Sequence, residues 1–434
     1  MNKNEEFTAR CTGITDQGFG VFRHDGKTVF AAGLLPGEEA RIRIIKLFKK
    51  YAIGKCVELL SKSDARTEPV CALAGKCGGC SFQQIRYEDQ LKYKHAELEH
   101  LFRQVDPDIE VLPVLGMKDP FYYRNKAQFP IAVEDGKVIS GFYRPRTNEI
   151  LDMVECPIQS KEINKIFAWI KATLPASLAE PLRHLLIRSS LKTKEAQVVF
   201  IGKTDAGLKD YAQKLARQFP EIVSILFNEN EGTDNVILGD HYHVLYGRDF
   251  IMEDCLGLKV QLHFKSFFQV NPVQMEVLYT QALEMADLKP SDTVIELYSG
   301  TGTIGMLAAR QAGSVIGVEI VEEAVKNARE NARLNHLDNV EFICEDASKF
   351  AAENTSDADV VIVDPPRKGM TEQGIADIVR LSPNRIVYIS CNPRTLARDL
   401  QSFAKAGYKC QKVQPVDMFP QTAHVETVAL MSKL

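Results

Sequence analysis

Two segments near the carboxyl-terminal end carry residue types that perform covalent and acid–base chemistry. Cys391 lies in ISCNPRT, directly after a predicted strand and before a predicted helix. A thiol at such a strand end is exposed, and a helix start stabilises its thiolate, so Cys391 is a candidate nucleophile. Glu426 lies in HVETV, a strand-like run in which a glutamate is as readily an edge residue facing water. Cys255, Cys344 and Cys410 are predicted to be small buried hydrophobes.

A glycine-rich loop lies upstream of both segments. Residues 294–305, VIELYSGTGTIG, place a G-x-G-x-x-G motif between a predicted strand and a predicted helix, where the backbone turns tightly and approaches a ligand. Its glycines are Gly300, Gly302 and Gly305. Glu319 ends the next strand, where a carboxylate accepts both hydroxyls of a ribose. Dinucleotide-binding proteins share these features, but Glu296 before the loop and Asp364 in the later DPP resemble S-adenosylmethionine (SAM) methyltransferases more closely.

Four further cysteines have the spacing of metal ligands. Three form a C-x5-C-x2-C group in a glycine-rich loop and the fourth is distant: Cys71, Cys77, Cys80 and Cys156. Thiolates need a flexible backbone to converge on one centre, which this loop provides. Zinc accepts four thiolates, although its sites more often pair two C-x2-C knuckles. The uneven triplet favours a [4Fe-4S] cluster over zinc, but the sequence alone does not decide between them.

The elements that position these residues follow a regular order. From residue 290 onward, predicted strands alternate with predicted helices, which indicates an α/β fold with a doubly wound, mostly parallel sheet of Rossmann type. The middle of the chain, about 110–260, mixes strand-like and helical runs in an α+β pattern. Residues 5–60 predict five short strands separated by Gly and Asp-Gly turns, typical of a small OB-like barrel: FTARCTGI, GFGVFRH, KTVFAAG, EEARIRIIKLF and YAIGKCVELL.

One amphipathic helix is predicted between the barrel and the middle region. It covers residues 87–105, where apolar residues and one histidine recur at helical spacing: Leu91, His95, Leu98, Leu101 and Phe102.

Composition excludes two classes of protein. With 45% hydrophobic and 25% charged residues, the chain buries a core and is not intrinsically disordered. Its apolar runs fall far short of the ~20 residues that span a bilayer, and the polar start MNKNEEFTAR lacks a secretory signal, so we expect a cytoplasmic protein without a membrane partner. A net charge of −4 argues weakly against nucleic-acid binding. Residues 41–50 carry basic side chains and no acid, but alone this run is better explained as a solvated strand face.

Together the motifs resemble one family. SFFQVN, ELYSGTGTIG, DPPRKG, SCNP and HVET follow in the order of bacterial RNA (uracil-5-)-methyltransferases that act on 23S ribosomal RNA, and ECPIQ surrounds Cys156 as in that family. The resemblance covers nearly the whole chain. It implies that the barrel is an RNA-binding TRAM domain, that the four cysteines hold a [4Fe-4S] cluster, and that the helix at 87–105 packs on the catalytic domain. It also implies Cys391 as the nucleophile, Glu426 as the base, and SAM contacts from Gln269, Tyr298, Gly300, Gly302, Glu319 and Asp364.

The domains that this resemblance implies are not all continuous in sequence. We expect a TRAM barrel, a central iron–sulfur and RNA-binding domain, and a SAM-dependent methyltransferase domain. Their ranges are 1–64 for the barrel, 65–86 and 117–262 for the central domain, and 87–116 and 263–434 for the methyltransferase domain.

The implied reaction explains why these residue types are needed. C5 of uracil is a feeble nucleophile, and attack of a thiolate at C6 gives an enolate that carries electron density at C5. After methyl transfer, a base must remove the C5 proton so that the thiolate leaves. The uridine must be flipped out of a helix or lie in a loop. Candidates for RNA contacts lie at 121–146, where an ordinary solvated strand face is an equally good interpretation: Arg124, Lys126 and Arg144.

We therefore expect a monomeric enzyme that methylates C5 of a uridine in 23S ribosomal RNA. The same reaction on a tRNA uridine is the alternative within the fold, and related tRNA enzymes usually lack both the TRAM barrel and the cysteine set, which favours ribosomal RNA. A non-catalytic RNA-binding protein that retains the methyltransferase fold is the alternative of another class. Intact Cys391, Glu426 and Asp364 argue against it.

Overall fold

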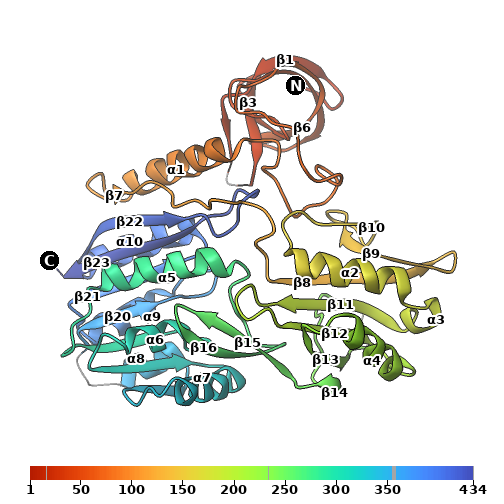
Figure 1. The fold of residues 1–434 in the computed structure, drawn as a ribbon. Helices are drawn as coiled ribbons and strands as arrows, with labels where there is room; N and C mark the ends of the chain where they lie inside the picture. Colours follow the sequence, from red (N-terminus) through yellow and green to blue (C-terminus); the bar gives the residue numbers. More distant parts are fainter. Residues whose placement is uncertain (16, 233, 354–357, 434) are drawn as a thin grey trace.

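The computed structural model of the chain describes residues 1–15, 17–232, 234–353 and 358–433. Figure 1 shows a barrel at the amino-terminal end, joined through helix α1 to two parts that are each built around a sheet. Among the described residues, every helix is too short or too polar to cross a membrane.

The barrel contains six strands where the sequence predicted five. The run expected as one strand divides at Cys11 and Thr12, because the chain leaves its first partner, β5, and then pairs with β3. The strand order β1-β5-β6-β4-β3-β2 curls around a core that includes Phe22, Val29 and Ile42. The strands are β1 (Glu6–Arg10), β2 (Gly13–Ile14), β3 (Phe19–His24), β4 (Lys27–Ala32), β5 (Glu39–Leu47) and β6 (Tyr51–Ser61).

Buried contacts hold the barrel against the rest of the molecule. Glu38, whose side chain is fully buried, accepts hydrogen bonds from Nε and Nη2 of Arg66 at 2.5 and 2.7 Å. Burial alone would raise the pKa of Glu38, but these bonds and two backbone N–H groups lower it below its ordinary value. A small apolar cluster then joins the barrel, the following segment, α1 and the segment before β23: Ile14, Leu35, Ala65, Phe82, Ile85, Tyr93 and Ala423.

Helix α1 (Tyr87–Arg103) lies on the carboxyl-terminal part, although it precedes the central part in sequence. Leu98 and Phe102 pack in the same buried cluster as helix α10 (Pro393–Lys405). After the helix, β7 (Glu110–Val111) adds to the edge of the carboxyl-terminal sheet beside β22. Between the barrel and the central part, the chain therefore first packs α1 and β7 against the carboxyl-terminal part.

The central part is a seven-stranded, mainly antiparallel sheet in the order β10-β9-β8-β11-β12-β13-β14. Helices α2 and α4 bury apolar side chains against one face of this sheet. The elements are β8 (Lys126–Glu134), β9 (Lys137–Tyr143), β10 (Ile150–Asp152), α2 (Lys161–Thr173), α3 (Ala176–Ala179), β11 (Leu182–Ser189), β12 (Ala196–Gly202), α4 (Leu208–Gln218), β13 (Ile222–Glu229) and β14 (Tyr242–Gly247).

The carboxyl-terminal part confirms the predicted doubly wound sheet. Its order is β19-β18-β17-β20-β21-β23-β22-β7, in which the first five strands are parallel and β23 is antiparallel to both neighbours. The strands are β17 (Thr293–Leu297), β18 (Ser314–Glu319), β19 (Val340–Cys344), β20 (Val360–Val363), β21 (Arg385–Ser390), β22 (Tyr408–Val416) and β23 (Glu426–Lys433).

Helices cover both faces of this sheet. Helices α5, α6 and α7 share one buried cluster with the hairpin of β15 and β16, and helices α1, α8, α9 and α10 share the other. Helix α8 was not predicted from the sequence. The bounds are β15 (Phe250–Cys255), β16 (Leu258–His263), α5 (Pro272–Ala286), α6 (Thr303–Ala308), α7 (Glu322–Leu334), α8 (Ala347–Glu353) and α9 (Glu372–Arg380).

Candidate active site and cysteine centre

A cavity of about 740 Å³ lies at the carboxyl ends of the parallel strands, where the strand order reverses between β17 and β20. Ligands of open α/β sheets bind at such a reversal point. The cavity brings together seven of the residues predicted for cofactor binding and catalysis: Gln269, Tyr298, Gly300, Glu319, Asp364, Cys391 and Glu426.

The glycine loop between β17 and α6 is held from the neighbouring strand. Glu319 accepts the N–H of Gly300 at 3.0 Å and the N–H of Val321 at 2.9 Å. Gly300 and Gly302 have positive φ angles of 53° and 74°. A Cβ on Gly300 would point into open space, whereas a Cβ on Gly302 would lie 2.3 Å from the ring of Phe342. Gly300 therefore faces the open cavity, while Gly302 is required by packing.

Glu296 connects the last turn of this loop to the sheet. Its Oε2 atom accepts the N–H of Gly305 in α6 at 3.0 Å, and a Cβ on Gly305 would lie 2.5 Å from the same oxygen. Burial raises the pKa of Glu296 well above its ordinary value, although the hydrogen bond from Gly305 opposes the rise. The third glycine of the motif thus leaves room for a buried carboxyl group that fixes the start of α6.

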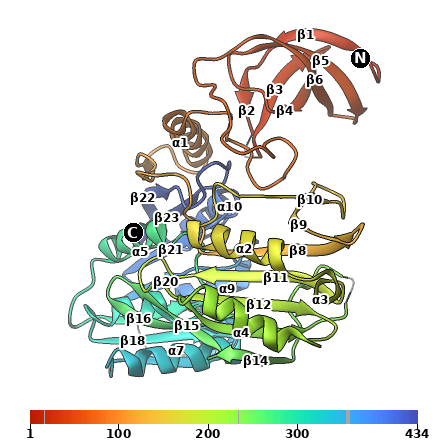
Figure 2. The ribbon, with the colours of Figure 1, turned by 45° about the vertical axis from the view of Figure 1, so that its right-hand side comes forward.

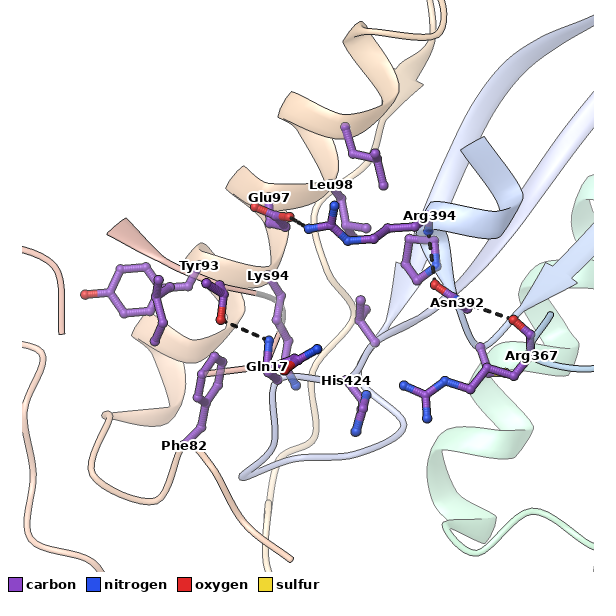
Figure 3. Close-up of a pocket in the computed structure, with 17 residues that line it drawn as sticks. Gln17, Phe82, Tyr93, Lys94, Glu97, Leu98, Arg367, Asn392, Arg394 and His424 are labelled. Carbon is purple, nitrogen blue, oxygen red and sulfur yellow. Dashed lines mark hydrogen bonds and ion pairs between the residues drawn. The ribbon is translucent and has the colours of Figure 1, made fainter. Parts of the chain in front are cut away.

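Cys391 lies between two cavities. It directly follows β21 and precedes Asn392, whose side chain caps α10. Besides the large cavity, it lines a smaller one of about 110 Å³ on the side of the barrel and α1. Figure 3 shows this smaller cavity, around which Gln17 of the barrel, Lys94 of α1 and His424 lie. The residue therefore borders both cavities.

Arg367 is a residue of this region to which sequence analysis assigned no role. It lines both cavities, and its backbone oxygen accepts a hydrogen bond from Nδ2 of Asn392 at 3.1 Å (Figure 3). The start of α10 is also tied to α1, because Nη2 of Arg394 lies 2.8 Å from Oε1 of Glu97. The DPPRKG motif that contains Arg367 was the available signal.

The expectation of a stabilised thiolate at Cys391 is wrong. Burial raises the pKa of Cys391 to about 11, and the nearby carboxylates of Glu426 and Asp364 add to the rise, while Arg367 opposes it. Burial first, and then the two carboxyl groups, therefore favour the thiol over the thiolate.

Glu426, which is buried, and Asp364, which is half-buried, form an acidic pair in the large cavity. Burial raises the pKa of both carboxyl groups above their ordinary range, and the charge of Asp364 raises that of Glu426 further. Carboxyl groups shifted in this way exchange protons near neutral pH, which suits general acid–base chemistry.

Two of the three cysteines predicted to be buried are buried. Cys255 and Cys410 are inside the protein, but Cys344 is exposed. The prediction for Cys344 is wrong because β19 is the edge strand of its sheet, and Cys344 is its last residue.

The four metal-ligand candidates line a separate cavity of about 310 Å³: Cys71, Cys77, Cys80 and Cys156. Among the residues that the structure describes, ligand atoms of Glu5, His24 and Asp25 gather within 4.8 Å of one another, whereas no three of these sulfurs do. One tetrahedral zinc ion, with Zn–S bonds of about 2.3 Å, would hold its sulfurs about 3.8 Å apart. No three of these sulfurs are therefore as close together as the ligands of one zinc ion.

The loop that carries Cys80 is fastened to the segment that leads to Glu426. The N–H of Phe82 donates to the backbone oxygen of Gln421 at 3.0 Å, and the N–H of Ala423 donates to Oγ of Ser81 at 3.1 Å. Gln90 of α1 exchanges two hydrogen bonds with Gln421, both of 3.0 Å. Hydrogen bonds therefore join the loop that carries Cys80 directly to the segment before the candidate base, Glu426.

The three candidates for RNA contacts differ in their surroundings. Arg124 lines the cysteine cavity, and its guanidinium lies 5.8 Å from the ring centre of Phe419. Lys126 is half-buried, and burial together with Arg188 lowers its pKa to about 8. Arg144 is half-buried and forms two hydrogen bonds with Glu149, at 2.6 and 2.9 Å. They do not form one basic surface, and their contact with RNA stays a prediction.

Comparison with protein families identifies two matches. Residues 86–434 match the family described as tRNA (uracil-5-)-methyltransferase, and residues 2–57 match the TRAM domain. The amino-terminal barrel is thus a TRAM domain.

Relatives and solved structures agree with this result. An "uncharacterized RNA methyltransferase" of Clostridium tetani is 41% identical over 448 residues, which cover 100% of this chain and 97% of that protein. A protein of the same description from Bacillus cereus is 41% identical over 451 residues, covering 100% and 98%. The crystal structure of Pyrococcus abyssi tRNA (uracil-54, C5)-methyltransferase in complex with S-adenosyl-L-homocysteine superposes with a TM-score of 0.78 at 26% identity, covering 98% of this chain and 100% of that one.

The raised pKa of Cys391 predicts slow alkylation at neutral pH. Because only the thiolate reacts, the rate with iodoacetamide should still rise about tenfold per pH unit at about pH 9. Asp364→Asn should raise the rate at that pH, because loss of a negative charge lowers the pKa of the thiol. Peptide mass spectrometry resolves the site, with the exposed Cys344 as the reference for reagent access. A rate that levels off below about pH 8 would contradict the prediction.

Proposed function

The chain belongs to the tRNA (uracil-5-)-methyltransferase family, and from this premise we propose that it methylates C5 of a uridine in 23S ribosomal RNA through a covalent bond to Cys391. The family and its dependence on SAM are shown by the comparisons. The position of Cys391 between two cavities carries the mechanistic part of the proposal. RNA enters from the barrel side, and the methyl donor occupies the larger cavity.

The residues of the large cavity suit SAM. We expect Gly300 and Glu319 to meet the nucleoside end, and Gln269, Tyr298 and Asp364 to line the remainder. Gly302 allows the loop between β17 and α6 to pack against the ring of Phe342. When bound, SAM supplies an electrophilic methyl group.

Cys391 and Glu426 divide the remaining chemistry. The Cys391 thiol gives its proton to solvent and its sulfur bonds to C6 of uracil, which moves an electron pair to C5. That pair forms the bond from C5 to the methyl group, the S–CH3 bond of SAM breaks so that S-adenosylhomocysteine leaves, and Glu426 removes the C5 proton. The electron pair of that C–H bond restores the C5–C6 double bond as the C6–S bond breaks, and the thiolate returns. The raised pKa of Glu426 matches a base that must also release its proton again.

The cysteine set suits a [4Fe-4S] cluster held by Cys71, Cys77, Cys80 and Cys156. The wide spacing of the sulfurs supports this choice over a single zinc ion. A cluster there would keep the 71–83 loop folded, and that loop holds the segment before Glu426.

A tRNA uridine is the second candidate substrate. The Pyrococcus abyssi tRNA enzyme matches 98% of this chain, so the match extends over the barrel, and a TRAM domain does not by itself distinguish ribosomal RNA from tRNA. The resemblance of the motifs and the cysteine set favours 23S ribosomal RNA. We expect the enzyme to act as a monomer.

The substrate is tested by mapping 5-methyluridine in a deletion strain. Mass spectrometry should find that one or two positions of 23S ribosomal RNA lose the methyl group, while every tRNA position keeps it. A plasmid copy should restore the modification, and a Cys391→Ala copy should not. Loss confined to tRNA would reject the ribosomal assignment and support the second candidate.

Two substitutions test the attack on C6 and the removal of the C5 proton separately. Cys391→Ala should abolish methylation and leave SAM affinity near normal, because attack on C6 is lost. Glu426→Gln should allow attack and methyl transfer but prevent release, so that protein and RNA migrate as one slow band on a denaturing gel after incubation with SAM. The double variant is the control and should give no such band. Full turnover by Glu426→Gln would assign proton removal to another group.

The metal centre is tested by purification without oxygen. The protein should be brown and contain about four irons per chain. Cys77→Ser should bleach it and expose the 71–83 loop to proteolysis, whereas Cys344→Ser should change neither property. Stoichiometric zinc without iron would overturn the assignment.

A further inference from the structure

The TRAM barrel carries an aromatic cluster at one end, in which Tyr51 is exposed and Phe30 and Phe48 are half-buried. Phe48 and Tyr51, at the turn between β5 and β6, stack with ring centres 4.5 Å apart and an angle of 19°. Phe30 of β4 meets Tyr51 edge-on at 5.7 Å. Tyr51 is 36% exposed, and the neighbouring Leu47 is 37% exposed. Aromatic rings that remain in contact with water next to apolar neighbours mark a binding surface more often than a core.

The basic run at 41–50 divides into two groups in the structure. Arg41 and Arg43 are neutralised, because Glu58 and Glu6 lie 2.8 and 2.6 Å from their guanidinium nitrogens. The second group lies around the aromatic turn: Lys46, Lys49 and Lys50. Among the residues that the structure describes, no carboxylate lies within 4.0 Å of these three ammonium groups, and that of Lys46 lies 5.0 Å from the ring centre of Phe48. Their positive charge is available to an anionic partner.

The cluster lies at the barrel end away from Cys391. Tyr51 pairs with Thr28 at the start of β4, and the far end of β4, at Ala32, leads to the apolar cluster against α1. At about 3.3 Å per residue, these two ends are about 13 Å apart. Figure 2 shows the amino terminus on the same distal side, away from α1, where the amino group of Met1 pairs with Asp25 at 2.9 Å. A nucleotide that reaches the aromatic turn is therefore not the one that reacts at Cys391.

We propose that this turn, with rings of Phe30, Phe48 and Tyr51 and ammonium groups of Lys46, Lys49 and Lys50, binds unpaired bases of the substrate RNA at a distance from the target uridine. Bases stack on exposed rings regardless of their sequence, and lysines pair with phosphates. A duplex hides its base faces, so the ligand is single-stranded RNA. The inference rests on the proposed function only in that the substrate is RNA.

Binding of a fluorescent, unstructured RNA of about 16 nucleotides to the full chain, measured by anisotropy, tests the proposal, since an OB-type barrel covers about 4–16 nucleotides. Tyr51→Ala should weaken binding about 5- to 150-fold, whereas Tyr51→Phe, which keeps the ring, should bind as the unmodified chain does. Val57→Ala on β6 is the matched control, because Val57 is 38% exposed and should leave affinity unchanged. Replacing Lys49 and Lys50 by Gln should lower the slope of log affinity against log salt by about 1.4.

Unchanged RNA affinity in Tyr51→Ala, with an unchanged melting temperature, would overturn the proposal. So would an equal loss in Val57→Ala, because the loss would then not depend on the ring. Methylation by the unmodified chain is measured separately. If RNA affinity depends on Tyr51 but no uridine is methylated, RNA binding at the aromatic turn is supported and the proposed reaction is rejected. If methylation occurs but Tyr51 has no effect on affinity, the proposed reaction is supported and RNA binding at the aromatic turn is rejected.

Discussion

The ion pair between Lys94 and Asp417 is the contact on which the geometry of the candidate site depends. Nζ of Lys94 lies 2.6 Å from Oδ1 of Asp417, with side chains only 2% and 0% exposed, and the hydroxyl of Tyr87 donates to the other carboxylate oxygen at 2.8 Å. Two charges are withdrawn from water only when each compensates the other, and removal of one partner of such a pair typically destabilises a protein by about 3–5 kcal/mol. Helix α1 is therefore tied to the start of the segment that ends at Glu426.

That segment, residues 417–425, forms hydrogen bonds with three other parts of the chain. α1 contributes Gln90, the cysteine loop contributes Ser81, and the central part contributes the hydroxyl of Tyr123, which donates to the backbone oxygen of Pro420 at 2.9 Å. The central part also holds Gln269, which lines the large cavity, because Nδ2 of Asn125 donates to its backbone oxygen at 3.2 Å. The methyltransferase sheet thus supplies most of the cavity, and the other parts hold the segments that carry Gln269 and lead to Glu426.

The sequence predicted the residues that gather in the cavity better than the contacts that hold them. Strand–helix alternation places Gly300, Asp364 and Cys391 at one edge without knowledge of any partner. The face of α1 was predicted less well, since apolar spacing indicated Leu91 and Leu101, whereas the helix also buries Gln90 and Lys94. A lysine is predicted to be exposed unless its partner is known, and Asp417 lies 323 residues further along the chain. Long-range polar pairing leaves no periodic pattern in sequence. The ion pair between Lys94 and Asp417, which holds the segment before Glu426, therefore could not be predicted.

The same limit explains why Cys391 was expected to be a thiolate. Its local context, a strand end before a helix, favours the anion. Burial opposes it, and so do two carboxyl groups from elsewhere in the chain, Asp364 directly after β20 and Glu426 at the start of β23. These three acidic groups repel one another when ionised, so at least one proton is retained among them. A thiol kept protonated reacts slowly with oxidants and alkylating agents, because reactivity follows the thiolate fraction. The arrangement therefore keeps the proposed nucleophile protonated and weakly reactive before substrate binds.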